Sequence, residues 1–406
     1  MEEWKEYKLK DVTSVLGDGI HGTPKYDDDE SVFFINGNNL ENGKIVIRDT
    51  TKRVSLEEAS KHKKPLTSRT ILVSINGTLG NVARYNGEQC ILGKSACYFN
   101  VKEEYNIDYI YYVVANEVFR KEIERLATGT TIKNVSLETM RNYSFLAPSI
   151  EEQKKIASIL SSLDDKIELN RRINENLEQQ AQALFKSWFV DFEPFRDGEF
   201  VESELGMIPK GWRVGSLEEL CSFISRGLTP KYDDSSEELI LGQTCVRNNI
   251  VTLNNARKHK PKVKNEKWVK QWDVLLNSTG IGSLGRVGIV YFQMDNVAID
   301  SHITVVRTST PLYRHYVGRN LLSRQLEIEN MAVGSTGQTE LPRDRVKSMP
   351  IIIPSNDAMD NFNNLIEPMA ISMYRSIIES RRLAELRDTL LPKLMSGEIK
   401  VNEVEI

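Results

Sequence analysis

Two long stretches of the chain carry apolar residues three or four positions apart. In residues 150–189 these are Ile156, Leu160, Leu163, Ile167, Ile173, Leu177, Ala181, Leu184 and Trp188. In residues 356–396 they are Phe362, Ile366, Met369, Met373, Ile377, Leu383, Leu390 and Leu394. This spacing puts one apolar stripe along each helix, on the order of 55 Å long at ~1.5 Å per residue. We predict two long helices whose stripes pack on each other.

The predicted ends of these helices carry capping signals. Ser149 follows Pro148 and precedes Glu152 by three residues, which is the pattern of a capping box. Asn356 is the expected N-cap of the second helix, and Pro368 is expected to kink that helix near its start.

The regions before each long helix have a different pattern. Short β-rich runs broken by Gly and Asn, such as SVFFI, TILVSI, DVLLNST and RVGIVYF, predict strands. A single helix is expected in each region, around residues 108–127 and 311–331. The fold class is therefore predicted to be α+β.

The sequence is also repeated. The string TPKYDD occurs at residues 23–28 and at residues 229–234. Further pairs fall in the same order at an offset of about 205, including Trp4 with Trp212 and residues 127–149 with residues 332–355. One tandem duplication explains this pattern, because a solenoid would need several short repeats.

The bulk composition is that of an ordinary protein of 406 residues. It has no apolar run long enough for a membrane helix, and its first residues lack the apolar core of a signal peptide, so we expect a cytoplasmic protein without membrane contact. The four cysteines form no CxxC pair and are expected to be reduced, and no histidine spacing indicates a metal site.

The net charge of -4 is unevenly distributed. Residues 1–149 carry -1, residues 150–204 carry -6, residues 205–355 carry +6 and residues 356–406 carry -3. Clustered basic charge matters more for nucleic-acid binding than the charge of the whole chain, so the acidic total does not exclude DNA. The acidic long helices are better suited to bind basic proteins.

No motif in the chain predicts catalysis. GIGSLG at residues 280–285 matches a dinucleotide-binding pattern, and Asp300 follows about 20 residues later. The next residues, RVGIVYF, favour a strand over the required helix, so we interpret the motif as a strand–turn–strand with glycines at positive φ. The chain also lacks a P-loop and the [ND]PP[FYW] tetrapeptide of amino-methyltransferases.

Polar loops recur in both copies at matching positions. Each TPKYDD copy puts a cation and an aromatic ring on a Pro-fixed turn, and each copy has a hydroxyl-rich, flexible loop before its long helix. Backbone N–H groups, hydroxyls and cations of this kind suit phosphate oxygens, although any one of these loops could equally be a solvated turn. The residues are Lys25, Tyr26, Thr130, Thr131 and Lys133 in the first copy, and Lys231, Tyr232, Ser335, Thr336 and Gln338 in the second.

The whole chain resembles the specificity (S) subunits of Type I restriction–modification systems. The resemblance rests on the half-repeat plan, the W-x4-L start of each mixed region, the G-[ST]-T loops, and the strings PSIEEQKKIASILSSLDDKIELN (residues 148–170) and LRDTLLPKLMSGEI (residues 386–399). One departure is Glu340-Leu-Pro where the first copy has Asn134-Val-Ser.

The resemblance implies a division of the chain and a set of partners. It implies target-recognition domains at residues 1–149 and 205–355, long helices at 150–189 and 356–396 that form an antiparallel coiled coil, a linker at 190–204 and a tail at 397–406. Each recognition domain would read one half of a split site in double-stranded DNA, and the helices would set the spacer.

The resemblance also implies which subunits carry the chemistry. Two modification subunits would bring S-adenosylmethionine and methylate adenine N6, and restriction subunits with an ATP- and Mg-dependent translocase would join them. The chain itself would bind no cofactor and would not be an enzyme.

Positions that differ between the copies are the candidates for base readout. These are Asn36, Asn38, Asn39, Asn76 and Thr78 in the first copy, and Gln243, Arg247, Ser278 and Thr279 in the second. Asn and Gln suit adenine and Arg suits guanine in the major groove, which is an assignment by residue type alone. Two alternatives stay open: a coiled-coil assembly protein without DNA specificity, and a dinucleotide-dependent enzyme.

Overall fold

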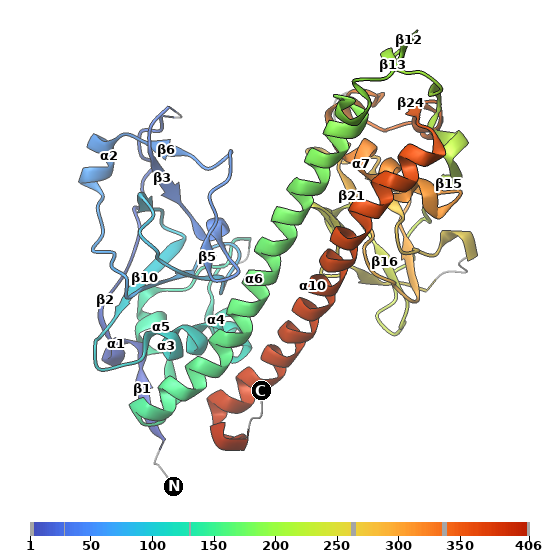
Figure 1. Ribbon diagram of the computed structural model, residues 1–406. Coiled ribbons are helices and arrows are strands. Elements are labelled where there is room, and N and C mark those ends of the chain that lie inside the picture. Colours follow the sequence, from blue (N-terminus) through green and yellow to red (C-terminus); the bar gives the residue numbers. More distant parts are fainter. Residues whose placement is uncertain (1–3, 28, 130, 261–264, 335–338, 404–406) are drawn as a thin grey trace. The chain divides into compact units, whose positions relative to one another are not determined.

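The computed structural model describes residues 4–27, 29–129, 131–260, 265–334 and 339–403 (Figure 1). The chain forms two compact units. Unit 1 comprises Met1–Ile167 and Arg381–Ile406, and unit 2 comprises Glu168–Ser380. This division cuts across both long helices, so each unit combines one mixed region with one end of each helix.

Unit 1 is built around an antiparallel sheet in the order β2-β10-β7-β8. A second sheet has the order β6-β3-β9, in which β3 and β9 are parallel, and β1-β11 and β4-β5 form two-stranded pairs. All residues of β7 and β10 are buried, as expected for central strands rich in apolar side chains. The strands are β1 (Lys5–Lys8), β2 (Thr13–Asp18), β3 (Val32–Ile35), β4 (Leu40–Glu41), β5 (Lys44–Ile45), β6 (Arg53–Val54), β7 (Thr70–Ser74), β8 (Val82–Arg84), β9 (Cys90–Leu92), β10 (Ala96–Val101) and β11 (Ser144–Ala147).

The short helices of unit 1 begin at side-chain caps. The predicted single helix at 108–127 is wrong, because the structure has two helices there. Asn116 ends the first in an extended conformation and caps the second by accepting from the Val118 N–H at 3.0 Å. The helices are α1 (Leu9–Val12), α2 (Leu56–Lys61), α3 (Ile107–Ala115), α4 (Glu117–Leu126) and α5 (Leu137–Asn142), with 3₁₀ turns η1 (Gly37–Asn39) and η7 (Val401–Glu403).

Unit 2 repeats the sheet plan of unit 1. Its main sheet has the order β15-β23-β20-β21-β18-β17, and β19-β16-β22 again joins an antiparallel and a parallel pair. The pair β14-β24 corresponds to β1-β11. The strands are β12 (Phe200–Ser203), β13 (Gly206–Pro209), β14 (Arg213–Ser216), β15 (Cys221–Arg226), β16 (Leu239–Leu241), β17 (Val246–Arg247), β18 (Asn249–Val251), β19 (Arg257–Lys258), β20 (Val274–Asn277), β21 (Val287–Ile289), β22 (Val297–Ile299), β23 (Ile303–Thr308) and β24 (Pro350–Ile353).

The predicted single helix at 311–331 is also interrupted. A 3₁₀ turn precedes α7, and Arg324, whose φ and ψ are not helical, separates α7 from α8. The helices are α7 (Arg314–Ser323), α8 (Gln325–Asn330) and α9 (Arg343–Lys347), with 3₁₀ turns η2 (Glu193–Phe195), η3 (Leu217–Leu220), η4 (Gln243–Cys245), η5 (Asn265–Lys267) and η6 (Pro311–Tyr313).

The two long helices are α6 (Ile150–Phe189) and α10 (Asn356–Ser396). The hydroxyl of Ser149 accepts from the Glu152 N–H, as the capping pattern predicts. The cap of α10 is Ser355, whose hydroxyl accepts from the Ala358 N–H at 3.3 Å, so the prediction of Asn356 as cap is wrong by one residue. Helix α10 is unbroken at Pro368.

Within each unit the ends of α6 and α10 run antiparallel. In unit 1, Leu160 of α6 and Leu391 and Leu394 of α10 belong to one buried core. In unit 2, the ring of Phe189 on α6 lies 4.8 Å from that of Phe362 on α10. Asp164 of α6 pairs with Arg387 of α10 in unit 1, and Asn170 of α6 pairs with Glu379 of α10 in unit 2. Within each unit, residue numbers therefore rise along α6 while those of α10 fall, which defines the antiparallel direction.

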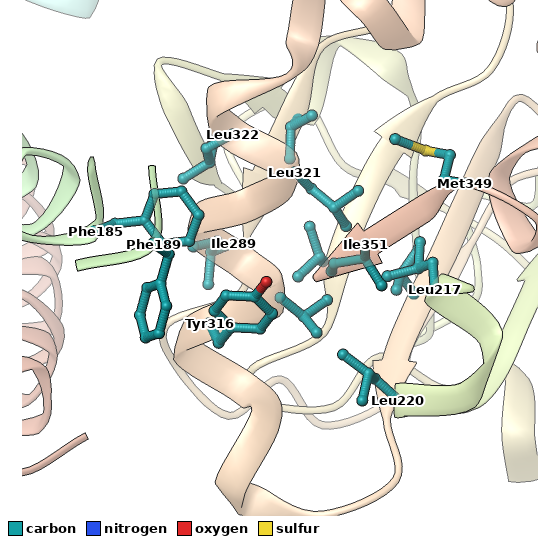
Figure 2. Packing of buried hydrophobic residues seen from close by; sticks show 14 of the residues in the cluster. Phe185, Phe189, Leu217, Leu220, Ile289, Tyr316, Leu321, Leu322, Met349 and Ile351 are labelled. Carbon is teal, nitrogen blue, oxygen red and sulfur yellow. The ribbon is translucent and has the colours of Figure 1, made fainter. Parts of the chain in front are cut away.

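The core of unit 2 joins the end of α6 to the sheet and helices of that unit. Figure 2 shows Phe185 and Phe189 of α6 beside Tyr316 of α7, and the two rings lie 5.8 and 4.8 Å from that of Tyr316. Ile289 of β21 and Ile351 of β24 are buried in the same cluster. Aromatic side chains bury large apolar areas, so this contact anchors the helix firmly on the domain. In the described residues, no helix combines the length and apolarity needed to cross a bilayer.

Candidate nucleic-acid interface

The two TPKYDD loops occupy equivalent places in the two units. Tyr26 pairs through its backbone with Val54 of β6, and Tyr232 pairs with His259, next to β19. Strands β6 and β19 are the outer antiparallel strands of the matching three-stranded sheets. The repeated loop is therefore a repeated structural element, whose sixth residue in the first copy, Asp28, lies outside the described residues.

Each loop is held through the backbone of its lysine. The Lys25 N–H donates to Glu58 Oε1 at 3.1 Å, and this bond is the main reason why the pKa of Glu58 lies below its usual value. The Lys231 N–H lies 2.9 Å from His259 Nδ1 and donates to it when the ring proton is on Nε2, and burial lowers the pKa of His259, which favours the neutral ring. Both lysine side chains are exposed and remain available to a phosphate.

The aromatic residue of each loop makes a different contact. Tyr26 lies 5.6 Å from the ring of Phe34, whereas the guanidinium of Arg257 lies 3.4 Å over the ring of Tyr232. Both tyrosines are exposed, at 39 % and 47 %. The Arg257–Tyr232 pair adds a cation beside Lys231 that the sequence analysis did not single out.

In unit 1 the structure brings two predicted segments together. The turn after β7 contacts the loop before α5: the Gly77 N–H donates to the Lys133 carbonyl at 3.0 Å, and Asn76 Nδ2 donates to Asn134 Oδ1 at 3.0 Å. Thr78, Thr131 and Lys133 are exposed on this surface. Thr130 lies outside the described residues.

Unit 2 forms the same junction with different side chains. Thr279 and Val333 both pair through the backbone with Glu340, as Asn76 and Thr128 do with Asn134. The Glu340 carboxylate pairs with Arg226 at 2.9 Å. Glu340 in place of Asn134 therefore changes the partner of the side chain, while the backbone pairing between turn and loop stays the same. The predicted residues Ser335, Thr336 and Gln338 lie outside the described residues.

The GIGSLG stretch is a turn between β20 and β21, and a strand follows it. Gly280, Gly282 and Gly285 have positive φ values of 95°, 69° and 82°. The strand–turn–strand interpretation is confirmed, and the helix that would bind a pyrophosphate does not follow the motif.

The candidates for base readout divide into exposed and buried residues. Asn38, Arg247 and Thr78 are exposed. Gln243 is partly buried and its amide donates to the Thr279 hydroxyl at 3.0 Å, while that hydroxyl also contacts His302 Nδ1 at 2.8 Å. Gln243 and Thr279 stabilise the turn after β20 through these hydrogen bonds. Their side chains are therefore less free to hydrogen-bond the edge of a DNA base.

Three other candidates belong to the framework. Asn39 is 6 % exposed, and its amide donates to the Val46 carbonyl at 3.0 Å. Asn36 Oδ1 accepts from Ser95 Oγ at 3.0 Å. Ser278 is fully buried, and its hydroxyl contacts that of Thr304 at 2.6 Å. All three side chains are engaged inside the domain, and their role in base readout stays a prediction.

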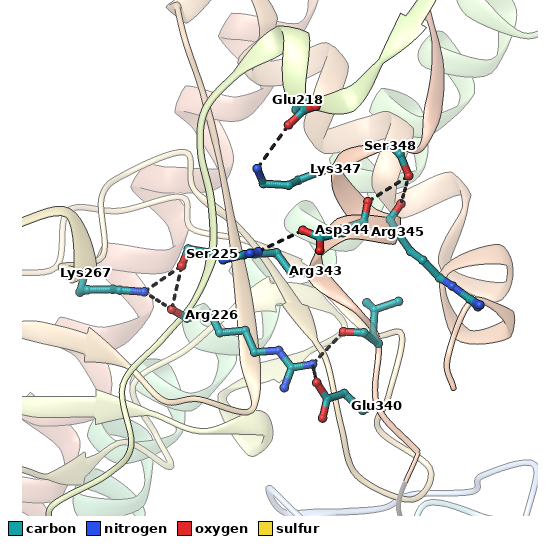
Figure 3. Close-up of polar contacts among 11 residues, drawn as sticks. Glu218, Ser225, Arg226, Lys267, Glu340, Arg343, Asp344, Arg345, Lys347 and Ser348 are labelled. Atoms are coloured by element: carbon teal, nitrogen blue, oxygen red, sulfur yellow. Dashed lines mark hydrogen bonds and ion pairs between the residues drawn. The ribbon is translucent and has the colours of Figure 1, made fainter. Parts of the chain in front are cut away.

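A polar cluster beside the unit 2 junction was missed. Figure 3 shows Arg226 reaching Glu340, and Lys267 reaching Ser225 Oγ at 2.9 Å. A hollow of about 370 Å³ opens here and is lined by Ser225, Arg226, Gly227, Lys267, Glu340, Arg343 and Asp344. The signal in the sequence is a charge reversal, since Arg226 occupies the place of Asp18 in the first copy at an offset of 208.

Metal-binding groups and cysteines were also considered among the described residues. They contain no group of three or more His, Cys, Asp or Glu side chains placed to hold a metal ion. All four cysteines fall within the described ranges and are free thiols, and burial raises the pKa of Cys90 and Cys221 to about 12.

Comparison with known proteins shows which family the chain is similar to. Residues 1–179 match the family profile described as the Type I restriction modification DNA specificity domain. The Type I restriction enzyme MjaIX specificity subunit of Methanocaldococcus jannaschii is 28 % identical, with 99 % of this chain and 95 % of that protein covered. Over its whole length the chain is similar to Type I restriction–modification specificity subunits.

Further comparisons extend over the whole chain. The HindI specificity subunit of Haemophilus influenzae is 25 % identical over 98 % of this chain and 100 % of its own length. The S subunit structure from M. genitalium has a TM-score of 0.56 at 17 % identity, and 97 % of this chain and 96 % of that chain are covered, which shows a shared fold. Specificity subunits are the non-catalytic members of these systems, which agrees with the prediction made from the motifs.

Proposed function

We propose that this chain is the DNA-reading subunit of a cytoplasmic Type I restriction–modification complex and that each unit reads one half of a split site. The observation that carries the proposal is the repeated junction of turn and loop, with the same backbone pairing at Asn76–Asn134 and Thr279–Glu340. A chain with two similar surfaces can address two half-sites, as a symmetric dimer does on a palindrome.

The division of labour within each surface follows from exposure. The two TPKYDD loops are alike and present Lys25 and Lys231, so they are proposed to contact phosphates of any sequence. Exposed positions that differ between the units, such as Asn38 and Arg247, are proposed to read bases. The charge of +6 over residues 205–355 supports this role for unit 2.

The long helices are proposed to set the spacer between the half-sites and to bind two adenine-N6 modification subunits. These partners, and not this chain, are proposed to hold S-adenosylmethionine. Restriction subunits that use ATP and Mg²⁺ are proposed to join the same complex. The acidic charge of residues 150–204 suits the binding of basic protein surfaces.

A domain exchange tests the proposal. Residues 205–355 are replaced by the matching region of a relative with another specificity, and the complex with its modification partner is assayed for the sites it methylates. One half of the methylated motif should change while the other half and the spacer stay. A change in both halves, or in neither, would contradict one half-site per unit. Loss of all sequence preference would favour an assembly protein.

A further inference from the structure

In unit 1 a tyrosine of the recognition domain binds a carboxylate on helix α6. Tyr112 of α3 donates its hydroxyl to Asp164 Oδ2 at 2.7 Å, and Arg387 of α10 donates to Asp164 Oδ1 at 2.7 Å. Tyr112 is 2 % exposed, while Asp164 and Arg387 are about one-third exposed. We name these three residues clamp 1.

Unit 2 contains the same chemistry at other positions. Tyr291 donates its hydroxyl to Glu178 Oε2 of α6 at 3.2 Å, and Arg319 of α7 donates to that hydroxyl at 2.6 Å. Arg319 Nη1 lies 2.5 Å from Glu178 Oε1, and the Arg319 side chain is only 1 % exposed. Tyr291, Arg319 and Glu178 form clamp 2.

The two clamps are not copies made by the duplication. The offset of 207 that relates β10 and α3 to β23 and α7 takes Tyr112 to Arg319, and the offset of 205 that relates β8 to β21 takes Tyr291 to Asn86. The same combination of tyrosine, carboxylate and arginine therefore occurs in both units on different residues. In both cases the carboxylate belongs to α6 and the tyrosine to the recognition domain.

Bonds of this kind restrict geometry more than apolar packing does. Apolar side chains tolerate small displacements, because the hydrophobic effect has no direction. A charge-assisted hydrogen bond holds only over a narrow range of distance and angle, and a buried guanidinium that loses its carboxylate carries a large penalty. A recognition domain that slid or turned on α6 would break its clamp.

We propose that clamps 1 and 2 are positioning residues that fix each recognition domain on α6, so that the complex accepts one spacer length. This inference rests on the proposed function, because a spacer exists only for a split site. It assigns a role that involves no contact with DNA to the six clamp residues, which are Tyr112, Asp164, Arg387, Tyr291, Arg319 and Glu178.

The experiment uses the complex with its modification partner and measures methylation of duplexes whose half-sites are fixed. The spacer is the natural length, one base pair shorter or one longer. The variants are Tyr112→Phe and Tyr291→Phe, which remove one hydroxyl each and keep the ring. Glu178→Gln removes the charge of clamp 2. If that variant fails to assemble, Tyr291→Phe decides for unit 2.

Each tyrosine has a matched control in its own unit. Tyr109 of α3 donates its hydroxyl to the Leu146 carbonyl at 3.1 Å, and Tyr316 of α7 donates to the Ile352 carbonyl. Both bonds stay inside the recognition fold. Tyr109→Phe and Tyr316→Phe therefore remove comparable buried hydroxyl bonds but no hydrogen bond to α6, and the Tyr316 ring keeps its packing against Phe185 and Phe189.

The three clamp variants should lose about tenfold of the preference for the natural spacer, while the two controls keep it. All five variants should keep the half-site sequences. One charge-assisted hydrogen bond is worth about that factor. Unchanged spacer preference in the clamp variants, or an equal loss in the controls, would overturn the inference. If the wild-type complex methylates no split motif, the proposed function fails as well.

Discussion

The lysine of each TPKYDD loop offers a direct test of the division between phosphate contact and base readout. The perturbation is Lys25→Ala or Lys231→Ala. Because the loops are anchored by the backbone N–H groups of these lysines, to Glu58 and His259, alanine leaves the anchoring bond in place. Each substitution removes one exposed cation and nothing from the core.

The expected magnitude follows from counterion release. One phosphate contact contributes about 0.9 to the slope of log affinity against log salt concentration. Between 50 and 200 mM salt, one contact therefore accounts for roughly a 3.5-fold change in affinity. Each single variant should lose this part of the salt dependence, and the double variant about twice as much.

The assay is titration of the complex into labelled duplexes at several salt concentrations, with the split site intact or scrambled. Both duplexes should show the same reduction in slope. Lys210→Ala is the control, because this exposed lysine pairs with Glu199 in the hairpin of β12 and β13. An unchanged slope, or an effect limited to one base of the intact site, would refute the assignment to phosphate.

Three further predictions concern single residues. Arg247→Ala should relax one base pair in one half-site by about 1–3 kcal/mol, measured by competition with single-base variants of the site. Arg307→Met should destabilise the protein by about 3–5 kcal/mol in urea unfolding, because it leaves Asp273, whose side chain is fully buried, without its 2.7 Å partner. Burial lowers the pKa of His315 to about 4, so its contribution to stability is complete above pH 6.5 and falls as the pH drops toward 4, by about 2 kcal/mol at pH 5. Urea unfolding at pH 7.5 and 5 should show this loss in the wild type and less of it in His315→Gln.

Each of these predictions has an outcome that contradicts it. A uniform loss of affinity for all sequences would make Arg247 a phosphate contact. A loss below about 1 kcal/mol would mean that water reaches Asp273 in the variant. An equal acid response in His315→Gln would assign the loss to other groups. Glu367 is one such group: partial burial raises its pKa, but hydrogen bonds from His315 and Arg314 outweigh burial, so this pKa lies below its usual value.

The sequence predicted the parts of the fold that depend on pattern over many residues. The long helices follow from apolar spacing sustained over about forty positions, where errors at single residues average out. The strand–turn–strand at residues 274–289 follows from β-branched residues after the glycines. The duplication was recognised by comparing the sequence with itself, and this comparison requires no structural information.

The errors arose where one residue or one distant contact decides the outcome. Asn116 separates two helices because it caps the second one. In the sequence, an asparagine that caps a helix looks the same as an asparagine on the solvated face of a continuous helix. The sequence also could not show that the amide of Asn39 donates to the Val46 carbonyl, because this partner is brought close only by folding. Tyr291 and Glu178 lie 113 positions apart, and no local pattern connects them.

The central claim is that this chain selects a split DNA sequence for adenine methylation. The most direct measurement is long-read mapping of N6-methyladenine in cells that carry the modification partner, with and without this gene. We predict a two-part adenine motif with a fixed spacer that is present only with the gene. Identical methylation in both cells, with the partner expressed and bound to this chain, would contradict the claim.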